Sequence, residues 1–367
     1  MKIAIYLPSF AIGGAERNII NLANEFASRG NEIILIVNTT NGKLKENLSS
    51  QIKLKNLNVK RTLMSFFGLF KILRKEKPDA LLSTLYHANI ISIFVSKFLM
   101  LNQVCIVRQE NTLEDFDSSI KSKVFKFLIS ITYPYADGFI GISEGVVKSY
   151  VKFLPKRSIK IFNPAIYDNI EKLKTKSVSD KFNKNIYNFI SVCRFTRQKN
   201  HELLIEAIRL FVSDPYVKNQ LSMFKFNLIG DGPEMIKIKT MVKEYSLENY
   251  ITFYGELANP YPLISHSDCY IMHSRWEGFG NSLVEGMYLT KNVITTNFST
   301  SANEITNNGQ YANVINHNLP SEMKKILIRA FKKELHEINC KEYLSNNFHL
   351  KKIATQYLSF INDAVKK

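Results

Sequence analysis

Two short segments in the second half of the sequence carry charged side chains suited to binding a phosphate-bearing ligand. Residues 191–201 contain Arg194 and Lys199, and residues 273–287 contain Glu277 and Glu285 with seven residues between the two carboxylates. Two cations beside the first amides of a helix can neutralise a diphosphate leaving group as its charge develops. These segments therefore predict a site that binds a diphosphate and assists its departure.

The second segment is expected to place a helix start beside these charges. A strand is expected to end near His273, and Gly278 and Gly280 disfavour a helix directly after it. A helix then begins at Asn281 or Ser282, and its first amides, with the positive end of the helix dipole behind them, suit a diphosphate. The amides predicted to point at it belong to Gly280, Asn281, Ser282 and Leu283.

Simpler explanations stay open for two of these charged side chains. Ser282 and Glu285 match the S-x-x-E capping box, in which the carboxylate only stabilises the start of the helix. Arg197, between the two cations, is expected to be an ordinary surface charge. Glu277 lies on the loop before the helix, where the capping explanation does not apply.

Apolar runs of strand length alternate with amphipathic helical segments along the chain. This pattern predicts an α/β fold whose parallel sheets are covered on both faces by helices. The first series of predicted strands is 2–8, 32–38, 79–84, 103–108 and 138–142. The second series is 187–193, 224–229, 250–254, 269–273 and 292–295.

Two series of strands predict two Rossmann-like, doubly wound domains. We expect an N-terminal domain over residues 1–164, a linker rich in Lys, Asn, Asp and Ser over 165–185, and a C-terminal domain over 186–349. A terminal helix at about 350–367 is expected to pack back on the first domain. Because ligands bind at the carboxyl ends of the strands in such sheets, the charged segments should face a cleft between the domains.

The composition is close to that of an average globular protein, with 45% hydrophobic and 22% charged residues. No stretch reaches about 18 uninterrupted apolar residues, and Gly13 and Gly14 interrupt the first apolar run, so neither a membrane-spanning helix nor a signal peptide is predicted. The cysteines lack the paired spacing of zinc sites or disulfides, which favours a reducing compartment and a cytoplasmic protein. The four are Cys105, Cys193, Cys269 and Cys340.

The net charge of +17 is concentrated in the first half of the chain. Residues 1–160 carry 23 basic and 12 acidic side chains, and residues 161–367 carry 26 and 20. No nucleic-acid-binding motif accompanies this charge, so nucleic acid is not an expected partner. The segments 63–77 and 120–128 interleave basic and apolar residues as basic amphipathic helices do. Either such helices lie on an anionic membrane surface, or their apolar stripes face the core and their lysines are merely solvated.

Several further motifs accompany the Glu277/Glu285 pair. They are the Arg194-to-Lys199 segment before Leu203-Leu204-x-x-Ala207, the turn from Gly230 to Glu234, Asn163-Pro164, Asp268, and Gly13-Gly14-Ala15-Glu16 after the first strand. Together these motifs span most of the chain and resemble the retaining family-4 glycosyltransferases of GT-B fold. Gly286, where that family often has alanine, is a small-for-small departure. The segment 298–304 replaces one that contains Gly-Pro, so the resemblance leaves the donor sugar open.

The resemblance implies a role for each matching residue. Arg194 and Lys199 would hold the donor diphosphate. Glu285 would meet the ribose hydroxyls of the nucleotide, and Glu277 the hydroxyls of the transferred sugar. The backbone at Gly13 and Gly14 would approach the donor phosphate and the acceptor.

Strand ends in the first half supply further candidates. His87 follows the predicted strand 79–84, and it either contacts the sugar, as in many family members, or is a hydrogen-bonded structural residue. The acceptor-side candidates at the next strand end are Arg108, Glu110 and Asn111.

The reaction implied is the retaining transfer of a hexose or N-acetylhexosamine from a nucleotide sugar, expected to be UDP-linked, to a glycan. The leaving phosphate would help to deprotonate the acceptor, so no protein nucleophile, metal or other cofactor is expected. The basic, aromatic-rich first half favours a lipid-diphosphate-linked acceptor in bacterial surface polysaccharide synthesis, at the inner face of the cytoplasmic membrane.

Two other functions stay open. A dinucleotide-dependent oxidoreductase should show Gly-x-Gly-x-x-Gly after the first strand and an acidic residue after the second, whereas this chain has Gly13-Gly14 and Asn38 there. A non-catalytic module that binds a nucleotide sugar would not need to retain Arg194, Lys199 or Glu277.

Overall fold

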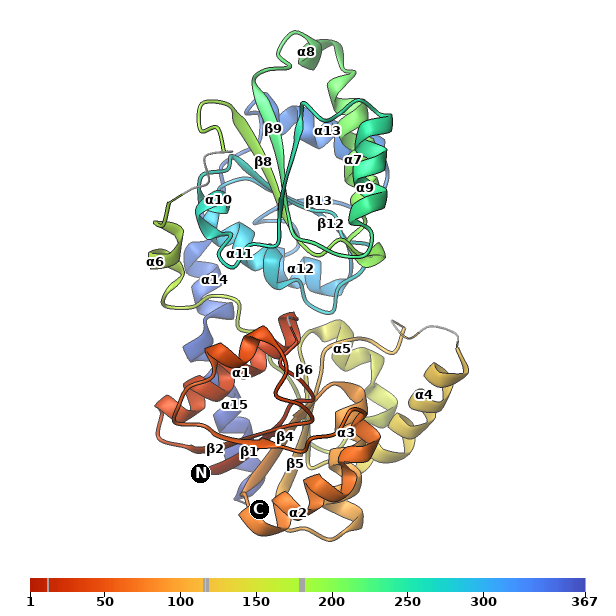
Figure 1. Ribbon diagram of the computed structural model, residues 1–367, viewed down its shortest axis with the longest axis vertical. Helices are drawn as coiled ribbons and strands as arrows, with labels where there is room; N and C mark the ends of the chain where they lie inside the picture. Colours follow the sequence, from red (N-terminus) through yellow and green to blue (C-terminus); the bar gives the residue numbers. More distant parts are fainter. Residues whose placement is uncertain (12, 115, 117–118, 178–181, 367) are drawn as a thin grey trace. The chain divides into compact units, whose positions relative to one another are not determined.

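The computed structural model describes residues 1–11, 13–114, 116, 119–177 and 182–366, which form two compact units (Figure 1). Unit 1 comprises Met1–Pro164 and Asn347–Lys367, and unit 2 comprises Ala165–Asn346. Each unit contains one parallel sheet with helices on its faces. The predicted architecture of two Rossmann-like α/β units is therefore confirmed.

Seven strands form the sheet in the described part of unit 1, in the order β3-β2-β1-β4-β5-β6-β7. β1 lies between β2 and β4, so the strand order reverses between β1 and β4. Such a switch point is where doubly wound sheets bind ligands. The strands are β1 (Lys2–Tyr6), β2 (Glu32–Val37), β3 (Lys53–Asn56), β4 (Ala80–Thr84), β5 (Val104–Gln109), β6 (Gly138–Gly141) and β7 (Ser158–Lys160).

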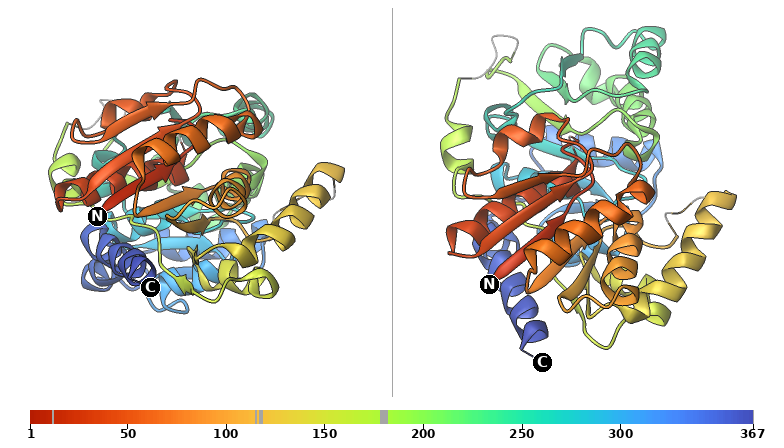
Figure 2. Two further views of the ribbon diagram at one scale, coloured as in Figure 1. Left: turned by 90° about the horizontal axis from the view of Figure 1, so that it is seen from below. Right: turned by 60° about the horizontal axis from the view of Figure 1, so that its bottom comes forward.

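Six α-helices and several short helical turns complete the described part of unit 1. The last of them, α15, buries Ile353 and Tyr357 in the same apolar cluster as β1 and α1. α4 projects from the rest of unit 1 in both views of Figure 2. The helices are α1 (Gly14–Ser28), α2 (Phe66–Glu76), α3 (Tyr86–Ile93), α4 (Ile120–Thr132), α5 (Glu144–Ser149) and α15 (Leu350–Val365); the turns are η1 (Lys43–Asn47), η2 (Thr62–Ser65), η3 (Phe94–Phe98), η4 (Tyr133–Tyr135) and η5 (Val151–Phe153).

Among the residues that the structure describes in unit 2, six strands form the sheet, in the order β10-β9-β8-β11-β12-β13. β8 lies between β9 and β11, which puts the switch point between β8 and β11. The strands are β8 (Tyr187–Val192), β9 (Phe224–Ile229), β10 (Ile251–Gly255), β11 (Cys269–Met272), β12 (Val293–Thr296) and β13 (Asn313–Ile315).

Helices follow most of these strands, and one lies in the segment expected to be a linker. α6 (Ile170–Lys174) packs against α10 of unit 2 and buries Ile170. Residues 178–181 of the predicted linker lie outside the described residues. The other helices are α7 (His201–Val212), α8 (Pro215–Lys218), α9 (Met235–Glu244), α10 (Tyr261–Ser265), α11 (Asn281–Leu289), α12 (Thr300–Thr306), α13 (Pro320–Phe331), α14 (Lys341–Phe348) and the turn η6 (Arg197–Lys199).

An aspartate directly before a strand joins that strand to its neighbour at three places. Asp79, Asp137 and Asp268 precede β4, β6 and β11. Each aspartate Oδ2 accepts a hydrogen bond, with an N···O distance of 2.7 Å, from a backbone amide of the adjacent strand. The donors are Lys2, Cys105 and Asn188 respectively. These contacts fix the amino ends of the strands, so that the loops at the carboxyl ends can carry the functional residues.

Candidate functional site

The loops after β8 and β11 meet at the switch point of unit 2. The Lys199 ammonium forms an ion pair with Glu277, although the two residues lie on different loops. The Glu277 carboxylate also accepts hydrogen bonds from Ser274 Oγ at 2.6 Å and from Gln198 Nε2 at 3.3 Å. Three donors therefore hold this carboxylate at one edge of the sheet.

Two further hydrogen bonds connect the same two loops. The Arg275 amide donates to the Gln198 carbonyl at 2.8 Å, and its guanidinium Nε donates to Asn200 Oδ1 at 2.9 Å. Burial acts to lower the pKa of Lys199, but the adjacent Glu277 outweighs it and the pKa is raised above its ordinary value. Lys199 is thus a fixed, partly buried cation rather than a mobile surface lysine.

Close backbone packing positions Arg194 beside this pair. At Gly230, with φ of 135°, a Cβ would lie 1.9 Å from the Cys193 carbonyl oxygen, and at Gly232 it would lie 2.4 Å from that of Phe195. Only glycine allows the Gly230–Glu234 turn to support residues 193–195 so closely. The Arg194 side chain is exposed, and its charge acts on Lys199. The predicted pair of cations therefore lies at one strand end.

The start of the helix after β11 agrees in part with the prediction from the sequence. α11 begins at Asn281, and its N-cap is Gly280 with φ of 105°, where a Cβ would approach the Phe298 ring within 2.9 Å. The amides of Asn281 and Ser282 occupy the first turn, where a helix leaves its amides without internal partners. The amide of Leu283, which was predicted to face the ligand, instead donates to the Gly280 carbonyl at 3.0 Å.

The structure does not support the capping explanation for Glu285. A capping box requires Ser282 as the N-cap, but the N-cap is Gly280 and no side chain caps this helix. Ser282 instead hydrogen-bonds the buried Tyr270. Glu285 is buried and accepts a hydrogen bond from Tyr261 Oη at 3.2 Å.

Gly286, the small-for-small departure, has a specific packing role. A Cβ at this position would lie 2.4 Å from Cδ1 of Tyr270. The Tyr270 ring occupies the space that a methyl group needs, so alanine at this position would require the ring to shift.

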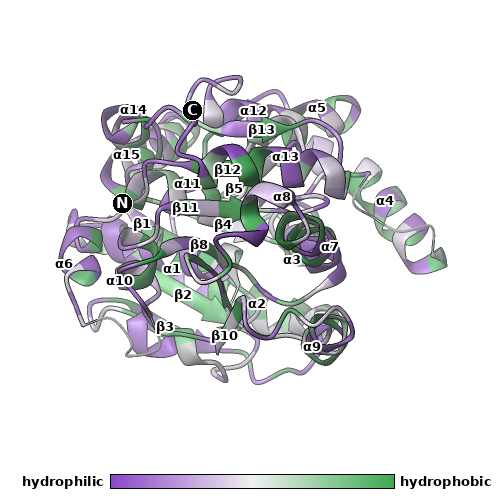
Figure 3. Cartoon of the chain, turned by 90° about the horizontal axis from the view of Figure 1, so that it is seen from above, coloured by the Kyte–Doolittle hydropathy of each residue, from purple (hydrophilic) through white to green (hydrophobic). Residues whose placement is uncertain are grey.

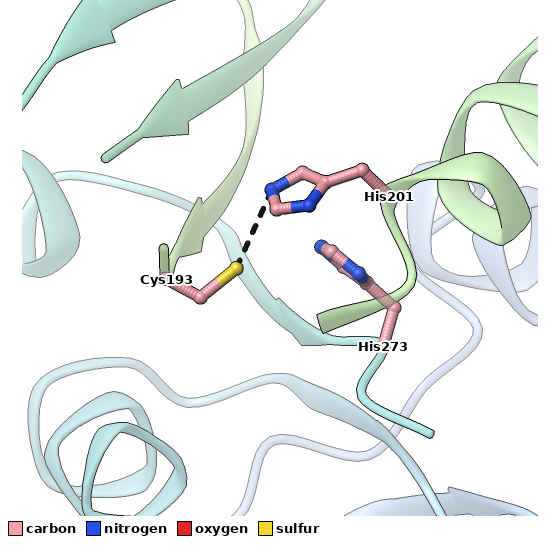
Figure 4. Close-up of side chains that lie close together, drawn as sticks. All are labelled: Cys193, His201 and His273. Carbon is pink, nitrogen blue, oxygen red and sulfur yellow. Dashed lines mark hydrogen bonds between the residues drawn. The ribbon is translucent and has the colours of Figure 1, made fainter. Parts of the chain in front are cut away.

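The half-buried Cys193 and the buried His201 and His273 lie close together (Figure 4). Lys199 and Glu277 are near this group, because their charges act on the Cys193 thiol. The three potential ligand atoms of the group lie within 4.8 Å of one another, and nitrogen and sulfur donors of this kind suit Zn²⁺. Cys193 and His273 are far apart in sequence, so spacing alone did not reveal the group. The chain therefore contains a set of potential metal ligands that the sequence did not predict.

Hydrogen bonds within the protein already engage this group. His273 Nδ1 donates to the Lys199 carbonyl at 2.5 Å, and its Nε2 accepts from Ser191 Oγ at 2.9 Å. Cys193 Sγ lies 3.5 Å from His201 Nε2. Burial lowers the pKa of His273 to about 4 and that of His201 to about 2, and it raises that of the Cys193 thiol to about 11. All three side chains are therefore neutral at pH 7 and position the loop that carries Lys199.

The switch point of unit 1 carries other predicted residues. Gly13 is the N-cap of α1, and the Glu16 carboxylate lies 2.1 Å from where a Gly13 Cβ would be. His87 lies in the first turn of α3, and the N-cap of this helix is Leu85, whose φ of 73° is unusual for a branched residue. Burial and then the charge of Lys121 lower the pKa of His87, so this ring is neutral at pH 7.

Arg108 is not placed to contact an acceptor. Its side chain is 0% exposed, and it donates to Tyr357 Oη at 2.9 Å, Thr84 Oγ1 at 3.0 Å and Asn163 Oδ1 at 2.5 Å. It also forms an ion pair with Glu110. Of the three acceptor-side candidates, Glu110 is therefore held in position by Arg108, and Asn111 is exposed.

Some contacts around these residues were missed from the sequence. Ser274 and Gln198 lie within the segments that we singled out, but nothing in their types predicted that both would bind Glu277. Tyr261 lies outside any motif, and no pattern in the sequence indicated its contact with Glu285.

Two family models match consecutive parts of the chain. The model described as "Glycosyltransferase Family 4" matches residues 12–167, and the model described as "Glycosyl transferases group 1" matches residues 174–347. Together they span most of both units.

Individual relatives and solved structures are similar to this chain over two thirds or more of its length. A 4-alpha-N-acetylgalactosaminyltransferase of Campylobacter jejuni, named for an undecaprenol-diphosphate-linked substrate, is 27% identical over 328 residues, 84% of each chain. An uncharacterised glycosyltransferase of Methanocaldococcus jannaschii is 26% identical over 260 residues, 67% of this chain and 62% of the relative. The crystal structure of HepE of Anabaena, in complex with UDP and glucose, has a TM-score of 0.79 at 18% identity and covers 99% of this chain and 100% of HepE.

Proposed function

Since this chain belongs to family 4 of the glycosyltransferases, with the GT-B fold, we propose that it transfers a hexose or N-acetylhexosamine from a UDP-sugar to a glycan acceptor with retention of configuration. The Campylobacter relative acts on an undecaprenol-diphosphate-linked glycan, and HepE was crystallised with UDP. These similarities support a UDP-linked donor and a lipid-linked acceptor. Bacterial surface polysaccharide synthesis is the process that we propose.

The Lys199–Glu277 ion pair at the switch point of unit 2 carries this proposal. In the proposed mechanism Arg194 and Lys199 bind the diphosphate, and the two cations stabilise the charge that develops as the sugar–phosphate bond breaks. The amides of Asn281 and Ser282 add the positive end of a helix dipole. A cation held in place, as Lys199 is by Glu277, stabilises the departing group without reorganisation.

The two carboxylates are proposed to orient the donor. Glu277, held by Lys199 and Ser274, accepts hydrogen bonds from hydroxyls of the transferred sugar, and Glu285 does so from the ribose. The acceptor hydroxyl loses its proton to the leaving phosphate, so no protein nucleophile takes part. Glu277 then acts by positioning and electrostatic support.

Unit 1 is proposed to serve the acceptor. The backbone at Gly13 and Gly14 approaches the donor phosphate, His87 contacts the sugar, and Glu110 with Asn111 faces the acceptor. We further propose that transfer needs no metal and occurs in the cytoplasm at a membrane surface. None of the described helices is long and apolar enough to cross a membrane.

A donor panel tests this function. Purified protein is incubated with each common UDP- and GDP-sugar, with and without a lipid-linked glycan, and nucleotide release is measured. We expect release with one donor, increased by the acceptor and abolished in Lys199→Ala and Glu277→Ala. Lys325→Ala, which removes an exposed lysine of α13, is the matched control and should retain full activity.

Two results would contradict the proposal. Absence of turnover together with a thermal shift by a nucleotide sugar would identify a non-catalytic binding module. Turnover that survives in Lys199→Ala and Glu277→Ala would place the reaction elsewhere in the protein.

A further inference from the structure

Large apolar side chains are exposed on neighbouring elements of unit 1. Phe67 at the start of α2 is 79% exposed, and Met100 just after η3 is 88% exposed. On α4, Ile120 is 81% and Phe127 63% exposed. Side chains of this size are normally buried, so their concentration on one unit requires an explanation.

The apolar stripe of α4 faces outward. Ile120, Val124, Phe127 and Ile131 are spaced four, three and four residues apart, which places them on one side of the helix, and all four are exposed. The opposite side buries Ile129 and Thr132. The alternative in which this stripe faces the core is therefore excluded. Figure 3 shows apolar and polar residues alternating along the projecting helix.

Ring contacts make the exposed surface continuous from α4 to α2. Tyr135 continues the α4 stripe, and its ring lies 5.9 Å from that of Phe98. Phe98 stacks on Phe94 at 4.7 Å, and Phe94 contacts Phe66 at 5.6 Å. Phe66 in turn contacts Phe67 at 5.1 Å. We call the exposed apolar side chains of η2–α2, η3 and α4–η4 the aromatic face.

Basic side chains lie on the same helices as the aromatic face. Lys71, Arg74 and Lys75 are exposed on α2, and Lys121 and Lys123 are exposed on α4. The helices themselves contain one acidic residue, Glu76, which is buried against three lysines. Glu114, Asp115 and Asp117 precede α4, and the two aspartates lie outside the described residues.

The exposed apolar side chains and the neighbouring lysines together favour an anionic membrane as the partner of the aromatic face. Aromatic and aliphatic side chains beside lysines suit the headgroup region of an anionic bilayer, which attracts the lysines and admits the apolar groups. A second copy of the chain would bring the same positive charges against each other, so the charge opposes self-association through this face.

We propose that the aromatic face seats unit 1 on the surface of an anionic membrane. This inference deepens the proposed function, because a lipid-linked acceptor lies in such a surface. Membrane binding by the aromatic face needs neither donor nor acceptor, so it can be measured apart from sugar transfer.

Vesicle binding by the full-length protein tests the proposal. Protein is sedimented with vesicles of phosphatidylcholine alone, or of phosphatidylcholine with phosphatidylglycerol, without any sugar nucleotide. We expect binding to the anionic vesicles only, weakened by salt. Phe67→Glu with Phe127→Glu should reduce the apparent affinity by at least about tenfold. The control Ile236→Glu with Leu319→Glu adds the same charge at exposed apolar positions of unit 2 and should bind normally.

A second pair of variants tests the basic side chains. Lys71→Gln with Lys121→Gln should weaken anionic binding, while Lys291→Gln with Lys325→Gln, which removes two exposed charges of unit 2, should not. All these side chains already face water, so the thermal midpoints should match that of the natural protein and exclude unfolding as the cause.

Three outcomes would overturn the proposal. They are failure of the natural protein to bind anionic vesicles, equal loss of binding in the unit 1 and unit 2 variants, and a dimer in solution that Phe67→Glu with Phe127→Glu dissociates. Vesicle binding without any sugar transfer would leave the inference standing and remove only the proposed function.

Discussion

Unit 1 and unit 2 share a doubly wound parallel sheet but differ in where their charges and exposed apolar groups lie. In unit 2 the strand-end loops hold a partly buried ion pair with a neighbouring arginine, and the exposed large apolar side chains lie on separate elements. In unit 1 the exposed apolar side chains form one continuous surface bordered by lysines. The comparison shows that the same scaffold carries charged side chains at a strand edge in one unit and a continuous exposed apolar surface in the other.

Arginine shows the same contrast at the level of one side chain. Arg194 of unit 2 is exposed on a loop, whereas Arg108 of unit 1 is fully buried with all its nitrogens engaged. We therefore expect loss of Arg194 to affect the reaction and loss of Arg108 to affect the fold.

The largest effect on stability is expected from Arg108→Ala. The change leaves Glu110 as an unpaired, mostly buried carboxylate and removes the bonds to Tyr357 and Asn163. Breaking a buried ion pair on one side costs about 3–5 kcal/mol, to be measured by urea unfolding. If Arg108→Ala were as stable as the natural protein but inactive in transfer, Arg108 would be assigned an acceptor-side role despite its burial.

Arg194→Ala should reduce kcat/KM without changing stability. A charge that acts on a developing anion contributes about 2–4 kcal/mol to the transition state, so the expected loss is about 30- to 10³-fold. Arg197→Ala, on the same loop and also exposed, is the matched control and should retain activity. Equal rates for the two variants would remove Arg194 from the diphosphate site.

Gly286→Ala should destabilise unit 2 by about 1–3 kcal/mol, because the new methyl group overlaps the Tyr270 ring. The measurement is the unfolding midpoint in urea, with Ala302→Gly, a buried helix residue elsewhere in unit 2, as a comparison of opposite size change. An unchanged midpoint for Gly286→Ala would show that Tyr270 can move aside.

The smallest effect is expected from chelation. If the hydrogen bonds of Cys193, His201 and His273 only position the loop, EDTA and Cys193→Ser should each change the transfer rate by less than about threefold, under 1 kcal/mol. Zinc content of the purified protein is measured alongside. Stoichiometric zinc, lost in Cys193→Ser together with activity, would make this group a metal centre and contradict the proposed metal-free transfer.

The sequence predicted the central strands because they are continuous apolar runs buried on both faces. It missed β3, β7 and β13, which are three or four residues long and lie at sheet edges. β7 is exposed at every residue, so no apolar pattern marks it. Edge strands are held by pairing with a neighbour, and one sequence does not display that pairing.

The candidate site was predictable where residues share a strand end, and unpredictable where side-chain direction decides. Arg194, Lys199 and Glu277 follow neighbouring strands, so topology alone brings them to one edge. Arg108 also lies near a strand end, but it is within β5, and its side chain points into the interior toward α15. Position in sequence gave the correct edge of the sheet but not the face to which this side chain points.

The core of unit 1 is completed by α15, the last helix of the chain. The bond from Arg108 to Tyr357 and the burial of Ile353 and Ile361 mean that residues 1–164 alone lack part of their own core. Unit 2 is one continuous segment, so it can fold during synthesis before α15 has been made. Unit 1 can complete its core only after α15 is synthesised. A protein truncated before α15 would therefore expose the apolar surface of its first domain and leave Arg108 Nε without its hydrogen-bond partner Tyr357.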